Sequence, residues 1–301
     1  MEALQKTEFL NMLANALAKP PQTPILRKPD EYGLEYEEIS FQASDGLTLK
    51  GWFIPAESNK LIIHNHFSPG TRYGYPGHME PYNTSGGFEV NFLPKYQALH
   101  EAGYNILTYD MRNHGESDAS PDEICGVGYW EWQDVIGSLR FARYDKRTSS
   151  MQISLQSMCM GANATLRAME KHPEEFDGIK SWILIQPLHG KTCIERSCEA
   201  MGIDSVEGTK EFEPINKKLT GLSFEDHNMR PLIKGVKIPT LVLQVRNDMV
   251  SREPDIQEIY EMLQVRDKKI IWIEDTPWRF HGYTYFSEHP EQMIKWYDSF
   301  M

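Results

Sequence analysis

The chain has 301 residues, of which 40% are hydrophobic and 25% charged, and its formal net charge is −12. This acidic balance provides no basic surface for nucleic acid and disfavours binding to anionic membranes. Apolar runs are too short to cross a bilayer, and residues 1–21 lack the basic start and unbroken apolar core of a signal peptide. Four unevenly spaced cysteines do not form a disulfide framework, so we expect a cytoplasmic protein.

An amphipathic helix is predicted within an N-terminal segment, residues 1–30. One face carries apolar residues at helical spacing before two prolines end the pattern: Leu4, Phe9, Leu10, Leu13 and Leu17. Its polar face is not rich in lysine, which argues against a membrane-surface helix. We expect the helix to pack on its own domain or on a second copy of the chain, so a homodimer stays open.

A hairpin followed by alternating strands and helices predicts an α/β fold. Residues 34–41 and 47–54 flank Ser44-Asp45-Gly46, a hairpin signal. Further strands are expected at 60–65, 104–109, 152–156, 181–186, 240–245 and 269–273. Helices are expected at 93–102, 129–144, 162–172, 253–263 and 290–300. This order predicts a mostly parallel central sheet with helices on both faces.

A polar, weakly periodic stretch at residues 187–237 interrupts this alternation. We interpret it as a small cap or lid insertion, with a core formed by residues 31–186 and 238–301. An insertion at this point would lie over the carboxyl ends of the strands, where open α/β sheets place their sites.

A candidate nucleophile stands between the strand at 152–156 and the helix that follows. Cys159 is flanked two residues away on either side by Ser157 and Gly161. A sharp strand-to-helix turn needs small residues at those positions so that the backbones can approach. If Ser157 were the nucleophile, the bulky Leu155 would occupy a flanking position that needs a small residue. Cys159 therefore fits the turn better than Ser157. The alternative is that Cys159 is one buried, inert thiol among four.

Other motifs extend the pattern along the chain. The turn Asp110-Met-Arg112-Asn113-His114-Gly-Glu-Ser117 resembles the Asp-x-Arg-Gly-His-Gly-x-Ser turn of α/β-hydrolases, with Asn113 in place of glycine. The strand before Asp248 resembles the one that delivers the family's acid, and Arg279-Phe280-His281 resembles its histidine loop. The resemblance implies the α/β-hydrolase fold and a triad of Cys159, Asp248 and His281, similar to that of dienelactone hydrolases. Alternatively, Asp248 caps a turn and His281 is a surface histidine.

The resemblance also implies an oxyanion hole made of two backbone N–H groups. One belongs to Met160, directly after the nucleophile at a helix N-terminus. The other belongs to Phe67 or Ser68, in a loop where His66 matches the family's histidine and Phe67 replaces a glycine. The loop at 67–88 is rich in aromatic residues. We expect His66, Tyr73 and Tyr75 to line a substrate pocket, the alternative being a packed loop.

A cysteine nucleophile predicts an acyl-thioester intermediate. Hydrolysis of an ester, thioester or lactone is the first interpretation. Acyl transfer or cyclisation through the same intermediate is the second, and a non-catalytic ligand-binding homologue is the third. The expected partner is a small-molecule acyl substrate, such as an acyl thioester, with or without an acceptor nucleophile.

No cofactor and no metal are expected. His64-x-His66 and the pair Cys193 and Cys198 could each supply two ligands, but further ligands are lacking nearby. If a native serine at position 159 had been replaced by cysteine, the sequence would read as it does here. The native identity of position 159 therefore stays open.

Overall fold

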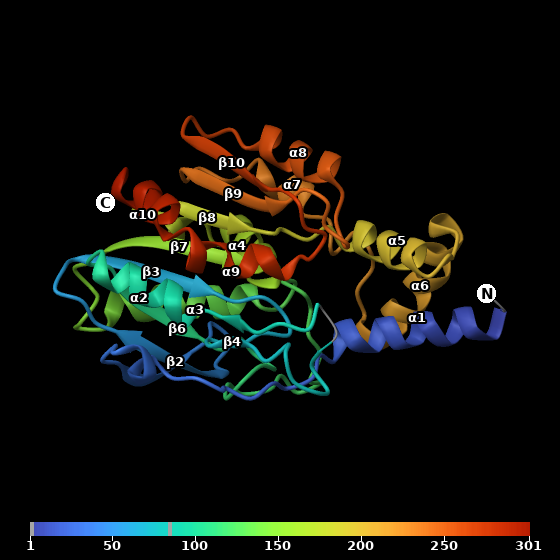
Figure 1. The fold of residues 1–301 in the computed structure, drawn as a ribbon, viewed down its shortest axis with the longest axis horizontal. Coiled ribbons are helices and arrows are strands. Elements are labelled where there is room, and N and C mark those ends of the chain that lie inside the picture. The colour runs from blue at the N-terminus through green and yellow to red at the C-terminus, as the bar shows by residue number, and fades with distance from the viewer. Residues whose placement is uncertain (1–2, 84–85) are drawn as a thin grey trace.

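An eight-stranded sheet forms the centre of the molecule in the computed structural model, which describes residues 3–83 and 86–301 (Figure 1). The strand order is β1-β2-β6-β3-β7-β8-β9-β10. Its strands are β1 (Glu37–Gln42), β2 (Thr48–Ile54), β3 (Lys60–Asn65), β6 (Asn105–Tyr109), β7 (Gln152–Met158), β8 (Trp182–Ile185), β9 (Thr240–Val245) and β10 (Lys268–Ile273). A separate small ribbon pairs β4 (Gly74–Tyr75) with β5 (Val90–Asn91).

The predicted mostly parallel sheet is confirmed. β1 pairs antiparallel with β2, and β2 pairs antiparallel with β6, while the remaining neighbours are parallel. The hairpin between β1 and β2 turns at Gly46, whose φ of 95° is readily adopted by glycine.

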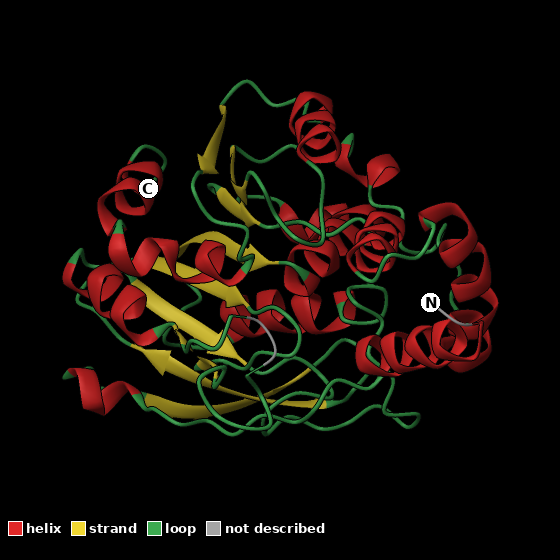
Figure 2. Ribbon diagram, turned by 45° about the vertical axis from the view of Figure 1, so that its right-hand side comes forward, coloured by secondary structure: helices red, strands yellow, loops and turns green. Residues whose placement is uncertain are grey.

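Helices cover both faces of the sheet, as Figure 2 shows. They are α1 (Ala3–Ala18), α2 (Leu93–Glu101), α3 (Trp132–Tyr144), α4 (Met160–Lys171), α5 (Gly190–Ala200), α6 (Ser205–Thr220), α7 (Arg230–Ile233), α8 (Glu253–Met262), α9 (Phe280–Glu288) and α10 (Pro290–Asp298). Two short 3₁₀ helices, Pro29–Tyr32 and Pro173–Phe176, lie in connections. The structure adds α5, α6, α7 and α9 to the predicted helices, and it places His281 in the first turn of α9.

Two apolar clusters lie on opposite faces of the sheet. Helices α3, α4 and α8 pack on one face through residues such as Val135, Leu166 and Ile256. Helices α2, α9 and α10 pack on the other through residues such as Leu99, Phe286 and Met293, and Cys159 belongs to this second cluster. Because both faces are covered, the central strands β3, β6, β7, β8 and β9 are buried along almost their whole length, whereas the edge strands β1 and β10 are partly exposed.

A third cluster joins α1 to α5 and α6, at one end of the molecule (Figure 1). Leu10 and Ala14 of α1 pack with Ile194 and Cys198 of α5, Phe212 of α6, and Ile203 in the connection between these two helices. Lys6 adds ion pairs to Glu207 and Glu211, both at 2.8 Å. Residues 187–237 therefore contain three helices, and two of them pack on the N-terminal helix.

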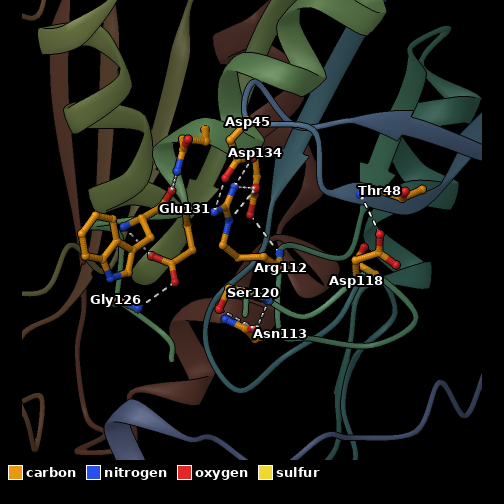
Figure 3. A network of polar contacts seen from close by, with 12 residues as sticks. Asp45, Thr48, Arg112, Asn113, Asp118, Ser120, Gly126, Glu131 and Asp134 are labelled. Carbon is orange, nitrogen blue, oxygen red and sulfur yellow. Dashed lines mark hydrogen bonds and ion pairs between the residues drawn. The ribbon is translucent and has the colours of Figure 1, made fainter. Parts of the chain in front are cut away.

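A buried arginine fixes the turn after β6, as Figure 3 shows. Arg112 donates to Asp45 at 2.9 Å and to Asp134 at 2.7 Å, which ties the β1–β2 hairpin to α3. Asn113, at the position where the family motif has glycine, adopts a φ of 64°. Its side-chain oxygen accepts the Ser120 N–H at 2.8 Å, so the turn keeps a left-handed residue without glycine.

None of the helices within residues 3–83 and 86–301 is long and apolar enough to cross a membrane.

A buried lysine lies between α2 and β3. Lys95 is fully buried, and its Nζ lies 3.1 Å from Nε2 of His64. Tyr96 Oη lies 2.8 Å from Nδ1 of the same ring. Burial lowers the pKa of Lys95 well below its ordinary value, and it lowers the pKa of His64 in the same direction. The unfolded chain therefore binds a proton at Lys95 that the folded chain disfavours, and this opposes folding at neutral pH.

We predict that Lys95→Met raises the free energy of unfolding by about 1 kcal/mol at about pH 7, net of the lost contact to His64. The gain should shrink as the pH rises toward 10.5, because the unfolded lysine then also loses its proton. Urea unfolding at neutral and alkaline pH measures this, with the exposed Lys218→Met as the control. A destabilised Lys95→Met at both pH values would contradict the prediction.

Candidate active site

Cys159 occupies a strained turn between β7 and α4. Its φ is 47° and its ψ is −109°, a conformation that L-residues rarely adopt. Its N–H donates to Ile185 O at 2.9 Å, and its carbonyl accepts from Asn163 N at 2.9 Å at the start of α4. The thiol thus lies at the carboxyl end of a central strand and at the N-terminus of a twelve-residue helix. This is the position of the nucleophile elbow that the sequence predicted.

The two small flanking residues each have a structural reason. A Cβ on Gly161 would lie 2.6 Å from both Asn65 O and His66 O, so glycine is required where α4 passes the end of β3. Ser157 is fully buried, and its hydroxyl lies 3.0 Å from Asn65 Nδ2 and 2.9 Å from Thr165 Oγ1. Its hydroxyl is therefore occupied inside the core, which agrees with the choice of Cys159 over Ser157.

Two neutral histidines hold the loop after β3. His66 Nε2 accepts the Met111 N–H at 2.8 Å, so its Nδ1 carries the proton and donates to Phe67 O at 2.7 Å. His114 Nδ1 lies 2.8 Å from Arg112 O, and its Nε2 lies 3.0 Å from Ser68 Oγ. Burial lowers the pKa of both rings, that of His66 to about 3. The loop is therefore positioned by uncharged rings whose nitrogens are all occupied.

Candidate oxyanion donors lie beside the elbow. Among the backbone hydrogen bonds between described residues, none uses the N–H of Met160, Phe67 or Ser68 as donor. The Gly161 N–H donates to His66 O at 3.1 Å, which joins the start of α4 to the loop that carries Phe67 and Ser68. The structure thus leaves these predicted donors uncommitted on two adjoining segments, and their role in an oxyanion hole stays a prediction.

Arg279 occupies the space beside Asp248. Asp248 is 1% exposed and accepts from Nη1 of Arg279, which is 8% exposed. The Ser251 hydroxyl, 2.5 Å from Asp248 Oδ2, and the Gln244 amide, 3.1 Å from it, complete the surroundings of the carboxylate. The acid predicted for the triad is therefore buried and paired with a guanidinium. The sequence showed Arg279 two residues before His281, but nothing in the pattern indicated this role.

His281 lies apart from the other two triad residues. Its Nδ1 is 2.6 Å from Thr276 Oγ1, and its ring stacks on Phe88 with centroids 4.8 Å apart. Across the described part of the chain, no hydrogen bond or ion pair joins His281 to Cys159 or to Asp248. Cys159, Asp248 and His281 follow the parallel strands β7, β9 and β10 at the same edge of the sheet, and the complete triad stays a prediction.

The aromatic residues of the 67–88 loop are packed. Tyr73 is fully buried and donates to Glu89, and Tyr75 is 2% exposed and donates to Tyr82 O at 2.9 Å. Phe67 stacks on Tyr283 with centroids 4.0 Å apart and planes 13° apart. The predicted pocket residues His66, Tyr73 and Tyr75 are thus enclosed in this structure, which agrees with the alternative of a packed loop.

A small cavity of about 40 Å³ lies next to the elbow, between the core and the helices α1, α5 and α6. Asn163, one turn after Cys159, lines it together with residues from each of these elements, among them Leu17, Cys125, Leu188, Cys193 and Phe212. Its lining is mostly apolar.

All four cysteines are free thiols, including Cys193 and Cys198. Burial raises the pKa of Cys125 well above its ordinary value and raises that of Cys193 to about 12. Burial also raises the pKa of Cys198. A search of the described residues for three or more clustered metal-ligating side chains finds no such group.

Comparison with solved structures identifies the fold. The esterase Pf2001 of Pyrococcus furiosus matches with a TM-score of 0.72 and 18% identity, over 95% of this chain and 98% of that one. The α/β-hydrolase GrgF of Penicillium sp. sh18 matches with a TM-score of 0.60 and 17% identity, over 89% and 99% of the two chains. A dienelactone hydrolase of Anabaena variabilis matches with a TM-score of 0.53 and 14% identity, over 89% and 99%. The chain has the α/β-hydrolase fold, as its motifs predicted.

Sequence relatives cover less of the chain, and no family model matches it. The uncharacterized protein YfhR of Salmonella typhi is 26% identical over 142 residues, 45% of this chain and 41% of that protein. The polyketide transferase GrgF of Penicillium sp. is 27% identical over 137 residues, 45% and 40% of the two proteins. The match thus spans about two fifths of the length of these curated relatives.

We predict that Gly161→Ala destabilises the protein by about 2 kcal/mol, because the added methyl group collides with two backbone carbonyls that cannot move independently. Gly235→Ala is the matched control, because the nearest atom to its added Cβ is 3.3 Å away and its φ is not positive. Urea unfolding of both variants tests this. Equal stability of the two would show that the end of β3 does not constrain the elbow.

Proposed function

We propose that this protein cleaves ester, thioester or lactone bonds through an acyl intermediate on Cys159, and that water is the usual acceptor. The observation that carries the proposal is the placement of Cys159 at φ 47°, on the elbow between a central strand and a helix N-terminus. A strained elbow of this kind exposes a side chain to a reacting group, and the helix N-terminus favours negative charge beside it. The names of the structural neighbours, esterase and dienelactone hydrolase, agree with this class of reaction.

In the proposed reaction the thiolate of Cys159 attacks the acyl carbon, and the carbonyl oxygen becomes an oxyanion. The N–H of Met160 and that of Phe67 or Ser68 stabilise this charge, because preorganised donors act strongly where water is excluded. Collapse of the tetrahedral species breaks the bond to the alcohol or thiol, which leaves with a proton, and a thioester to Cys159 remains. Water then attacks the thioester, releases the acid and returns the thiol.

His281 is the proposed proton carrier: it takes the proton of the Cys159 thiol, gives it to the leaving group, and later removes a proton from the attacking water. To serve, its ring must leave Thr276 and Phe88, because its Nδ1 is held at 2.6 Å from the Thr276 hydroxyl. Asp248 would orient it after such a movement, which requires a new arrangement around Arg279. The movement of His281 and the roles of His281 and Asp248 are parts of the proposal.

Acyl transfer is the second candidate. Cys159 is only 6% exposed, and this burial would shield an acyl thioester from water. An acyl thioester also reacts readily with amines, alcohols and carbanions. The name of one relative, polyketide transferase, points the same way.

We predict that esters, lactones or acyl thioesters leave a mass increment of one acyl group on the intact protein, located at Cys159. Cys159→Ala should abolish the increment, because no other group takes the place of the thiol. Cys198→Ala is the matched control, since Cys198 is buried in the cluster of α1, α5 and α6. Intact-protein and peptide mass spectrometry measures the increment.

The outcomes separate the candidates. Loss of the increment in plain buffer indicates hydrolysis, and loss only after an amine, alcohol or thiol is added indicates transfer. Cys159→Ser separates a native thiol from a replaced serine, because a gain in turnover would identify serine as the original nucleophile. Absence of any increment and of any turnover over the whole panel would contradict the proposal and favour a non-catalytic ligand-binding protein.

A further inference from the structure

The cavity between the core and the N-terminal helix lies close to Cys159. Asn163 lines the cavity, and its backbone N–H donates to Cys159 O at 2.9 Å. The side chain of Asn163 donates to Leu188 O at 2.9 Å and accepts from Leu188 N at 3.3 Å, which holds Leu188 beside the first turn of α4. Leu188 and Cys193 line the cavity and also belong to the apolar cluster that contains Cys159. Asn163, Leu188 and Cys193 therefore lie between the cavity and the elbow.

The cavity is uncharged. Among the described residues that line it, none is Asp, Glu, Lys or Arg. Burial lowers the pKa of His227, so its ring is neutral at neutral pH, and burial raises the pKa of Cys125 and Cys193, so both stay protonated. Asn216 and Thr220 each donate to a backbone carbonyl at 2.9 Å. Because a charge is costly to bury without a partner, the cavity excludes charged groups and favours apolar ones.

The end of α1 closes the cavity. Leu17 and Ala18, the last two residues of α1, line it. Ala18 O accepts the Cys125 N–H at 2.8 Å, which ties this end of the helix to the core. Lys6, near the other end of α1, forms ion pairs with two glutamates of α6. The helix is thus a fixed wall of the cavity, opposite the wall that faces the elbow.

The size of the cavity suits a short chain. Its volume of about 40 Å³ holds about three groups of the size of water, since one such group needs about 10–15 Å³ of space in which its centre can move. Three methylene groups have a similar size, and burying each one stabilises a bound chain about fourfold.

We propose that this cavity takes the apolar chain of the acyl substrate, and that the end of α1 sets the length of chain that fits. The inference rests on the proposed function, because it names the substrate class of the same site: esters, thioesters or lactones of short, uncharged aliphatic acids. The chain reaches the cavity past Leu188 and Cys193, while its acyl carbon stays at Cys159.

Alkyl methanethiosulfonates test the cavity without any acyl turnover. The Cys159 sulfur attacks the sulfur that carries the alkyl chain, and a disulfide bond forms. Methanesulfinate leaves with the bonding electrons, and the thiol proton passes to solvent. Peptide mass spectrometry measures the rate at Cys159 for the methyl, hexyl, decyl and sulfonatoethyl reagents, each divided by the rate of the same reagent with 2-mercaptoethanol.

The hexyl reagent should react about tenfold or more faster than the methyl reagent, because part of its chain is buried in the cavity. The decyl reagent should react more slowly than the hexyl reagent, since the end of α1 limits the space. The sulfonatoethyl reagent should be slower than the hexyl reagent by about tenfold or more, because no lining residue balances its charge.

Two variants of α1 test the length limit in opposite directions. Ala18→Leu adds bulk to the wall and should lower the ratio of the hexyl rate to the methyl rate about fivefold or more. Leu17→Ala enlarges the cavity and should raise the ratio of the decyl rate to the hexyl rate. Ala16→Leu is the matched control, since Ala16 lies on the exposed face of the same helix, and it should leave both ratios unchanged.

A rate at Cys159 that does not depend on chain length would overturn the inference and leave the proposed function standing. Equal ratios in Ala18→Leu and Ala16→Leu would also overturn it. If Ala18→Leu does not fold, an unchanged decyl-to-hexyl ratio in Leu17→Ala decides against the inference. The predicted labelling profile together with a silent acyl panel would contradict the proposed function alone and leave the cavity as a binding site for apolar chains.

Discussion

The buried ion pair between Arg279 and Asp248 is the interaction on which the site depends. It connects the end of β9 to the start of α9, and the further contacts of Arg279 reach Gln186 at the end of β8 and Tyr283. Breaking a buried pair by removing one partner typically costs about 3–5 kcal/mol, because the other charge is left uncompensated. The pair is thus a constraint on the shape of the site.

The buried histidines of the core have a structural role. His64, His66 and His114 are fully enclosed, and burial lowers the pKa of each, so they act as neutral hydrogen-bonding groups. Two of them hold the loop that carries Phe67 and Ser68 at the elbow. An uncharged support of this kind leaves the positive charge of the site to Arg279 and to the helix N-terminus. The proposed proton carrier, His281, is a histidine that this support does not use.

Much of the fold was predictable because most strands and turns are indicated by residue patterns within the segment itself. The hairpin, the order of strands and helices, and the elbow at Cys159 follow from turn residues, period and small flanking residues that do not depend on distant contacts. Helices α5 and α6 were not predicted individually, because a large part of their apolar surface packs on α1 in a small separate cluster. Both helices are amphipathic, so the weak period assigned to residues 187–237 from the sequence understated their helical pattern.

The arrangement at the end of β10 was not predictable in the same way. In the motif, Arg279 and His281 are two residues apart. The motif does not determine which of these two side chains points toward Asp248. That choice depends on where α9 begins and on the left-handed Asp275, whose φ is 59°. It also depends on the stacking of His281 on Phe88, a residue almost two hundred positions earlier in the chain. These are tertiary effects, and a pattern of residue types does not encode them.

The central claim is that Cys159, on its elbow, is the nucleophile that attacks an acyl carbon. The relative rates at which a thiol-directed electrophile labels the four cysteines, measured by peptide mass spectrometry, test this most directly. The account predicts that Cys159 is labelled faster than Cys125, Cys193 and Cys198, because burial raises the pKa of those three thiols. A Cys159 that reacts no faster than Cys193 would contradict it.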